Sequence, residues 1–504
     1  MSNTAHHNNE STHTDSDIAP PLALKSEPYS IFDRRQKAII VFLVAVAATF
    51  SGFASNAYFP AITAVARDLH VSNELINLTI TAYLVFQGLG PSLWSPLSDV
   101  KGRRIAYICC FIVFIAACIG LGLCQNYATL LVLRMLQSAG SASTITIGSG
   151  VLGDITTRAE RGGYMGIFQA GFLTPVAIGP VIGGALAGAL GWRSIFWFIV
   201  IYCGIFLAIL VLVLPETLRY RVGNGSRLPT GLIGRWPLVL YQKTTKVQWA
   251  SSPPAARPSK KHVNVLGPLR ILTSKQAAPI ILFLSIQYTV WYMGISAIAT
   301  LFEERYRLSE TQIGLTFIAN GVGSMLGTLT TGKILDIDFQ KIQRKLAEES
   351  GSDGTAPVDP TDPKFPLERA RLRLMPAFTI VQVLSLLLFG WTVHYSDKVP
   401  LAIPIISTFV TGWTAVGMQS AITTYLVDVF SDQSAAASAS LNLARCLLAA
   451  GGTSIIIPLI NAIGVGWAFT LCAVVQILSL AGVFVQWKFA GKWRQEADEK
   501  SATS

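Results

Sequence analysis

The chain has 504 residues, of which 51% are hydrophobic and 13% are charged, with a net charge of +11 and a mean hydropathy of +0.50. Soluble domains carry about a quarter charged residues, so this composition excludes an ordinary soluble protein. The basic residues flank apolar stretches, which favours membrane topology and contact with an anionic leaflet over binding to nucleic acid.

Apolar stretches of about 20 residues, the length that crosses the hydrocarbon core of a bilayer, recur along the chain. We predict twelve transmembrane helices and an all-α polytopic membrane protein. The predicted spans are 39–58, 75–95, 105–124, 128–151, 164–189, 194–214, 278–301, 311–333, 374–395, 402–426, 434–460 and 466–487.

The spans fall into two groups of six. We predict a disordered cytoplasmic tail at 1–35, a six-helix bundle at 36–214, a cytoplasmic linker at 215–277, a second six-helix bundle at 278–488 with a long cytoplasmic loop at 333–373, and a cytoplasmic tail at 489–504. Lys and Arg resist translocation, and most of them lie in the tail, the linker and the loops on one side. Both termini are therefore predicted to be cytoplasmic.

The loop after the second span, residues 95–104 (SPLSDVKGRR), combines a turn with opposite charges. Gly102 permits the sharp turn, and Asp99 can accept backbone N–H groups or pair with Arg103 or Arg104. Such a cluster can latch two halves in one arrangement and release them in another. Asp336 occupies the matching place after the eighth span. The alternative interpretation is positive-inside charge with a capping Asp.

Arg134 lies inside the fourth span, and Gln137 and Ser141 follow at spacings that place them on the same helix face. Arg445 lies inside the eleventh span, with Asn442 three residues before it. A guanidinium in lipid is expensive, so both are predicted to line a cavity for substrate or to tune a proton site. A structural arginine that pairs with carbonyl groups is the alternative.

The fifth span contains Gly179 and Gly183, and Gly184 and Gly188, at the four-residue spacing that allows close helix approach. Pro180, like Pro175, removes a hydrogen-bond donor and should bend this helix.

Polar or aromatic residues recur in the other spans that would line a central passage. They are candidates for an amphipathic cavity, or alternatively for hydrogen bonds between helices. These candidates are Asn56, Tyr83, Gln87, Gln169, Gln287, Trp291, Asn320, Trp413 and Gln419.

The middle of no predicted span contains Asp or Glu. A buried carboxylate is the usual partner of a bound cation or proton inside a membrane bundle, so a neutral or anionic ligand is favoured, and Asp99 or Asp154 at the ends of the spans are the candidates for proton coupling. The chain contains no phosphate-binding loop of the Walker type, no HExxH and no nucleophile elbow, so an enzyme is not predicted. We expect no cofactor and no metal site.

Three motifs resemble those of the major facilitator superfamily. Residues 95–104 resemble its loop signature, 131–142 (LVLRMLQSAGSA) its fourth-helix motif, and 175–184 (PVAIGPVIGG) its antiporter motif in helix five. The segments 194–198, 214–219, 223–226, 313–317 and 442–452 resemble one fungal branch of drug:proton antiporters, which holds quinidine-resistance-type multidrug exporters and citrate or itaconate exporters.

The resemblance implies a monomeric plasma-membrane exporter of small organic molecules, with protons as a further partner. It leaves the cargo open between hydrophobic drugs or toxic metabolites and organic acids such as citrate or itaconate. Two other possibilities remain: a potential-driven exporter of organic anions without proton coupling, and a nutrient receptor that does not transport.

Overall fold

The computed structural model describes residues 28–229, 235–247, 267–349, 366–430 and 434–502, and every regular element in these ranges is a helix. The N-terminal half contains α1 (Arg34–Asn56), the short 3₁₀ helix η1 (Phe59–Ala61), α2 (Ile62–Asp68), α3 (Asn73–Lys101), α4 (Arg103–Gly122), α5 (Tyr127–Ile155), α6 (Arg158–Leu190) and α7 (Arg193–Val213).

Three short helices follow in the connecting segment: α8 (Arg219–Val222), α10 (Leu238–Thr244) and α11 (Gly267–Leu272). The C-terminal half contains α12 (Ala278–Tyr306), α13 (Glu310–Glu349), α14 (Leu367–Leu372), α15 (Met375–His394), α16 (Ala402–Val429), α17 (Ser434–Ile463) and α18 (Val465–Ala502).

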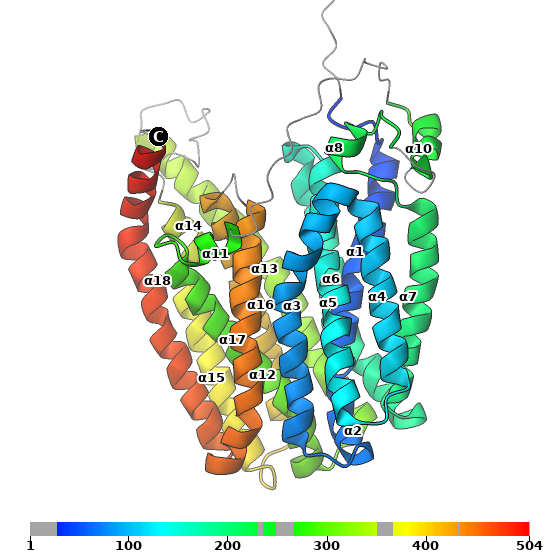
Figure 1. The fold of residues 1–504 in the computed structure, drawn as a ribbon. Coiled ribbons are helices and arrows are strands. Elements are labelled where there is room, and N and C mark those ends of the chain that lie inside the picture. The colour runs from blue at the N-terminus through cyan, green and yellow to red at the C-terminus, as the bar shows by residue number, and fades with distance from the viewer. Residues whose placement is uncertain (1–27, 230–234, 248–266, 350–365, 431–433, 503–504) are drawn as a thin grey trace, which may run out of the picture.

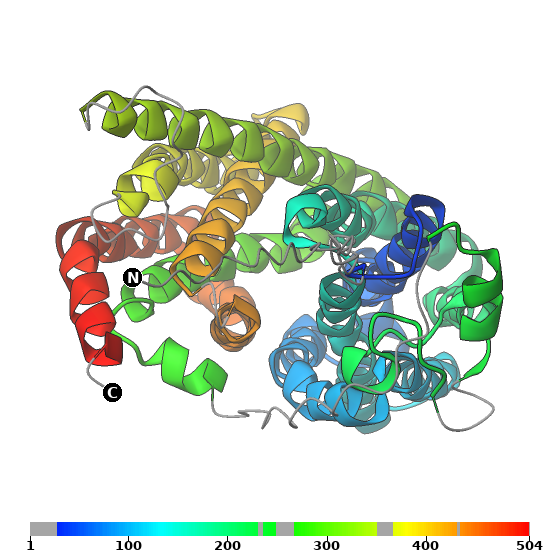
Figure 2. The same ribbon diagram turned by 90° about the horizontal axis from the view of Figure 1, so that it is seen from above.

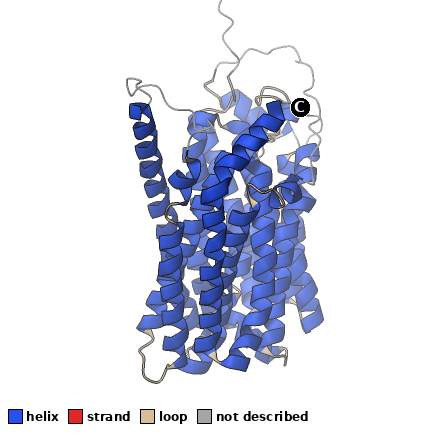
Figure 3. Cartoon of the chain, turned by 90° about the vertical axis from the view of Figure 1, so that its left-hand side faces the viewer, coloured by secondary structure: helices blue, strands red, loops and turns tan. Residues whose placement is uncertain are grey.

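The predicted all-α membrane fold is confirmed. Twelve helices in the described ranges have 20 or more residues, six in each half, and ten of these are apolar enough to cross a bilayer. The other two long helices, α3 and α16, are not among these ten. Figure 3 shows the long helices running side by side.

The two halves stand next to each other. In Figure 2, a view along the helices, the N-terminal helices group on one side and the C-terminal helices on the other. The linker helices α8, α10 and α11 lie at the same end as the C-terminus, and α2 lies at the opposite end (Figure 1). We call these the linker end and the loop end.

The core shows at which end the halves are joined. The large apolar core of the N-terminal half continues into the loop-end part of the C-terminal half, through residues such as Phe59, Tyr292 and Phe317. The linker-end part of the C-terminal half has a separate core, built around Met375, Met418 and Tyr425. The halves are therefore packed together at the loop end.

Several predicted boundaries differ from the structure. Residues 1–27 of the predicted tail lie outside the described residues, but Ile31 and Phe32 are buried and α1 begins at Arg34. Helix α13 continues to Glu349 and α18 to Ala502, where a loop and a tail were expected. These extensions are polar, so hydropathy marks the end of the apolar span and not the end of the helix.

Candidate functional site

The loop end is sealed by contacts between the halves. Arg67 Nη2 lies 2.9 Å from Glu310 Oε1 and 3.2 Å from Glu303 Oε1, and Asn461 Nδ2 donates to Glu74 Oε1 at 2.9 Å. Among the described residues, the ion pairs that join the halves all involve Arg67. The structure thus represents a state closed at the loop end.

The glycines of helix α6 pack against neighbours on two sides, one in the same half and one in the other half. A Cβ at Gly179 or Gly183 would meet Asn56 or Ala57 of the same half. A Cβ at Gly184 would meet the backbone of Glu310 and Gly314, and one at Gly188 would meet Thr311, in the other half. The predicted antiporter helix therefore packs on its own bundle through one pair and on α13 through the other.

Arg134 is held inside the N-terminal half. Its side chain is 1% exposed; Nη1 donates to Ala54 O at 2.9 Å and to Gln137 Oε1 at 2.6 Å. The guanidinium carbon lies 4.3 Å from the ring centre of Tyr58 and 4.5 Å from that of Tyr83. Two aromatic faces and a carbonyl group thus stabilise this buried charge.

Arg445 is held more loosely, in the C-terminal half. It is half-buried, donates to Asn442 Oδ1 from Nη2 at 2.9 Å, and lies 4.8 Å from the ring centre of Tyr288. Among the described residues, neither Arg134 nor Arg445 has a carboxylate within ion-pair distance.

The two arginines are linked across the interface along one path through α3. The Tyr83 hydroxyl, next to Arg134, donates to Ser51 O at 3.1 Å, and Gln87 Nε2 donates to Ser51 Oγ at 3.4 Å. Asn442 Nδ2 then donates to Gln87 O at 3.3 Å. Asn442 also accepts the hydrogen bond from Arg445, so the path ends at Arg445.

A second path runs through α1 and α12. Ser55 follows Ala54, whose carbonyl holds Arg134, and the hydroxyls of Ser55 and Tyr292 are hydrogen-bonded at 2.7 Å. The rings of Tyr292 and Tyr288 lie 5.3 Å apart, and Tyr288 contacts Arg445. We call the two paths together the interface ring.

Four residues of the ring were not predicted: Ser51, Ser55, Tyr288 and Tyr292. Ser51 and Ser55 form one pair and Tyr288 and Tyr292 the other, and each pair has the i, i+4 spacing that puts two side chains on one helix face. This spacing was a usable signal, but Ser and Tyr are frequent in membrane helices and neither pair stands out by charge.

The other predicted candidates do not all join the ring. Asn56 Nδ2 donates to Gly52 O of its own helix at 2.8 Å, and Gln287 Nε2 bonds Ser479 Oγ of α18 at 3.0 Å. Trp413 Nε1 donates to Thr330 Oγ1 at 3.0 Å. Gln169 is exposed, and Gln419 is half-buried.

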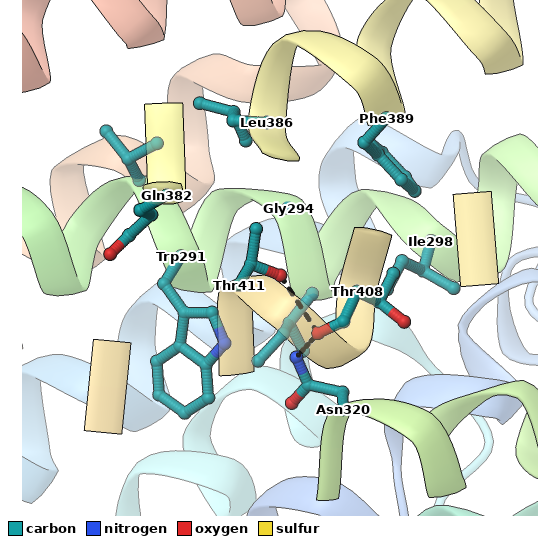
Figure 4. Close-up of a pocket in the computed structure, with 11 residues that line it drawn as sticks. Trp291, Gly294, Ile298, Asn320, Gln382, Leu386, Phe389, Thr408 and Thr411 are labelled. Atoms are coloured by element: carbon teal, nitrogen blue, oxygen red, sulfur yellow. Dashed lines mark hydrogen bonds between the residues drawn. The ribbon is translucent and has the colours of Figure 1, made fainter. Parts of the chain in front are cut away.

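Trp291 and Asn320 line a small pocket inside the C-terminal half (Figure 4). Asn320 Nδ2 donates to Thr408 O at 3.0 Å, and Trp291 packs against Tyr288 with ring centres 5.6 Å apart. The pocket therefore adjoins the interface ring at Tyr288.

The charged loop after α3 is ordered at the linker end. Arg103 pairs with Asp99 at 2.6 Å and with Asp154 at 3.1 Å, and Gly102 has φ +107° and no room for a Cβ beside Glu216. The buried Glu216 carboxylate accepts the Arg103 N–H at 2.9 Å. Arg104 Nη2 instead donates to Val211 O at 2.6 Å.

The C-terminal half has a matching cluster. Arg371 pairs with Asp428 at 2.9 Å and Arg373 with Asp338 at 3.3 Å. The side chain of Asp336, predicted to act here, lies outside what the structure describes. All these pairs stay within one half, so in this state neither cluster bridges the bundles.

The model of the Major Facilitator Superfamily matches residues 44–348 of this chain. The chain belongs to this superfamily. It is 37% identical to citrate exporter 1 of Aspergillus niger, over 94% of this chain and 90% of that protein. It is 32% identical to multidrug transporter QDR2 of Candida glabrata, over 94% and 83%.

Its fold also resembles the xylose transporter XylE of E. coli, solved in a partially occluded inward open conformation. The TM-score is 0.60 at 13% identity, with 90% of this chain and 98% of that chain covered. The predicted resemblance to a fungal branch of the superfamily is confirmed. This Major Facilitator Superfamily member is a transporter and not an enzyme.

Proposed function

We propose that this protein exports small organic anions by alternating access, with a binding site at the interface ring. The observation that carries this proposal is that two arginines from opposite halves, Arg134 and Arg445, are joined through hydrogen bonds and aromatic contacts that cross the interface. A ligand that binds between two halves can stabilise one arrangement of them over another.

The charge at this site favours an anion. Neither arginine has a carboxylate partner among the described residues, and Arg134 Nε has no hydrogen-bond partner there. Charge-assisted hydrogen bonds from guanidinium groups offset the desolvation of a carboxylate. The cargo class we propose is therefore a small organic acid of the kind represented by citrate or itaconate.

The topology that we propose makes export the natural direction. The positive-inside bias puts the linker end and both termini in the cytoplasm, so this state, closed at the loop end, would load from the cytoplasm. An inside-negative potential drives an anion outward with about 2.3 kcal/mol per charge per 100 mV. We place the protein in the plasma membrane, as a monomer with bundles at 36–214 and 278–488.

Proton coupling is a separate part of the proposal. The resemblance to drug:proton antiporters supports it, and Asp99 and Asp154 at the linker end are the candidate carriers. Because no predicted span has a carboxylate in its middle, export driven by the potential alone is the alternative.

A hydrophobic drug is the second candidate cargo. The aromatic residues that contact the arginines, Tyr58, Tyr83 and Tyr288, favour it, because aromatic faces also bind planar molecules. Trp291 adds a further ring beside Tyr288.

Uptake into sealed inside-out vesicles tests these alternatives together. Labelled citrate, itaconate and quinidine are offered while the voltage and the pH gradient are imposed separately. We expect the acids to be transported, with a rate that follows the voltage. Transport of quinidine alone would contradict the anion proposal, and an acid flux that needs the pH gradient at zero voltage would establish proton antiport. A protein that binds an acid without moving it would be a receptor.

A further inference from the structure

The linker helix α10 and the turn before it expose large apolar side chains at the outer edge of the N-terminal half. The helix lies beside the linker end of α7 and away from the C-terminal half (Figures 1 and 2). Trp236 is 50% exposed and Leu240 is 47% exposed, whereas Leu238 and Tyr241 are buried. Apolar side chains that gather on a surface mark a contact with a partner or with a membrane.

The buried face of α10 is anchored to the start of α1. The ring of Tyr241 packs edge-on against that of Phe32, with ring centres 5.6 Å apart. Gln36 Nε2 donates to Tyr241 O and to Thr244 Oγ1, both at 3.1 Å. These contacts hold the helix in one orientation, so its exposed face is a fixed part of the molecular surface.

This exposed face continues the lipid-facing side of α7. Arg104 Nη2 donates to Val211 O at 2.6 Å, and Nη1 of the same guanidinium donates to Trp236 O. The backbone of Trp236 is therefore held beside the last turn of α7, where Leu212 is 61% exposed. Helix α7 has the highest mean hydropathy of the ten candidate spans, so its exposed side chains face lipid. Trp236 thus lies where α7 leaves the hydrocarbon, the level at which Trp is enriched in membrane proteins.

Basic side chains accompany the apolar ones. Arg235, Lys243 and Lys246 are exposed, and among the described residues none of them has a carboxylate within ion-pair distance. Lys243 follows Leu240 by three residues, which puts an ammonium group and an apolar side chain on the same face of α10. Apolar and basic groups side by side are typical of helices that lie in the headgroup region of an anionic membrane.

We propose that α10 and the preceding turn bind an anionic phospholipid of the leaflet at the linker end. Trp236 and Leu240 would enter the upper part of the acyl chains, and Arg235 and Lys243 would bind the headgroup. Because α10 is bonded to α1 and its preceding turn to α4, the lipid would also hold the N-terminal half against the membrane surface. The inference concerns this surface alone and is independent of the cargo.

Quenching of tryptophan emission by brominated acyl chains tests the proposal. The full-length protein is placed in nanodiscs of phosphatidylcholine and phosphatidylserine, with one or the other lipid brominated at an equal share. The difference between the emission of the wild type and that of Trp236→Phe isolates Trp236. We expect brominated phosphatidylserine to quench Trp236 more strongly than brominated phosphatidylcholine. This preference should fall about fivefold in Lys243→Gln, since one basic residue near an anionic surface contributes about that factor in affinity.

Lys398→Gln is the matched control, because Lys398 is exposed in the connection between α15 and α16 at the opposite end. It should leave the preference unchanged. If neither brominated lipid quenches Trp236, another part of the chain or a second molecule covers this face and the inference is wrong. Equal quenching by both lipids, or an unchanged preference in Lys243→Gln, would also overturn it. None of these results bears on acid transport, so the proposed function is tested separately.

Discussion

Arg134 and Arg445 carry the same charge but are held very differently. Arg134 has a carbonyl, an amide oxygen and two aromatic rings around it and is 1% exposed. Arg445 is half-buried and has one amide oxygen and one ring. Apart from its unpaired Nε, Arg134 is built into its bundle, whereas the more exposed guanidinium of Arg445 has N–H groups left for a ligand.

Replacing Arg445 by Ala should therefore stop transport without unfolding the protein. We expect loss of citrate uptake by at least about tenfold, because a charge-assisted hydrogen bond contributes about 1.5–3 kcal/mol. Arg445→Lys keeps the charge and should retain part of the rate. The measurement is vesicle flux at equal surface expression, and an undiminished flux in Arg445→Ala would contradict the assigned role.

Replacing Arg134 should instead cost stability. Arg134→Ala leaves a cavity and removes the donor for Ala54 O and Gln137 Oε1, for a loss of about 2–4 kcal/mol. The apparent melting temperature in detergent should fall clearly, whereas Arg445→Ala should melt close to the wild type. Equal melting temperatures for Arg134→Ala and Arg445→Ala would show that the more buried arginine does not contribute more to stability.

At this scale the sequence predicted the charges better than their partners. An arginine in an apolar span can be recognised from the sequence alone, and so can Asn442 three residues before Arg445. The aromatic rings around each arginine come from other segments of the same half, and only the packing of the halves brings the hydroxyls of Ser55 and Tyr292 together.

Helix α6 shows how one element serves two contacts. Gly179 and Gly183 face α1, and Gly184 and Gly188 face α13. The repeated spacing predicted close approach but not the direction, because small residues fit against any neighbouring backbone.

Gly184→Ala should force the halves apart at the loop end, since its Cβ would lie 2.5 Å from Glu310 O. We expect a shift toward a state open at the loop end, seen as a longer distance between spin labels placed on α2 and on the start of α13. Gly166 in the same helix has no neighbour within 4 Å, so Gly166→Ala should leave the distance unchanged. An unchanged distance in Gly184→Ala would contradict this packing.

The start of α4 is stabilised by Glu216, a residue of the segment 214–219 that resembles the fungal branch. Glu216 accepts the N–H of Arg103 at 2.9 Å and that of Leu218 at 3.0 Å. A carboxylate at a helix start is favoured by the free N–H groups and by the helix dipole.

Glu216→Gln should destabilise the protein by about 1–3 kcal/mol, because an amide donor would replace an acceptor among N–H groups. Thermal unfolding in detergent measures this change. Glu304→Gln, at an exposed carboxylate without an ion pair in the described residues, is the control and should melt like the wild type. Equal melting temperatures for the two variants would show that Glu216 does not stabilise the start of α4.

For the whole molecule, hydropathy predicted the number and order of the long helices, because lipid leaves only helices or closed barrels as spanning elements. It could not find the polar end of α13 or the packed segment around Ile31 and Phe32, which lie outside the apolar spans. It also could not predict which end of the molecule is closed, since both states use the same helices.

The seal at the loop end has unequal charge: one arginine of the N-terminal half, Arg67, serves two carboxylates of the C-terminal half, Glu303 and Glu310. When the halves separate, these three groups line a mouth with a net charge of −1. In the orientation and with the cargo that we propose, an exported acid would meet repulsion from this mouth on its way back, and the rate of its return should rise as added salt screens the charges. The contacts that close this end would then also slow re-entry of the acid.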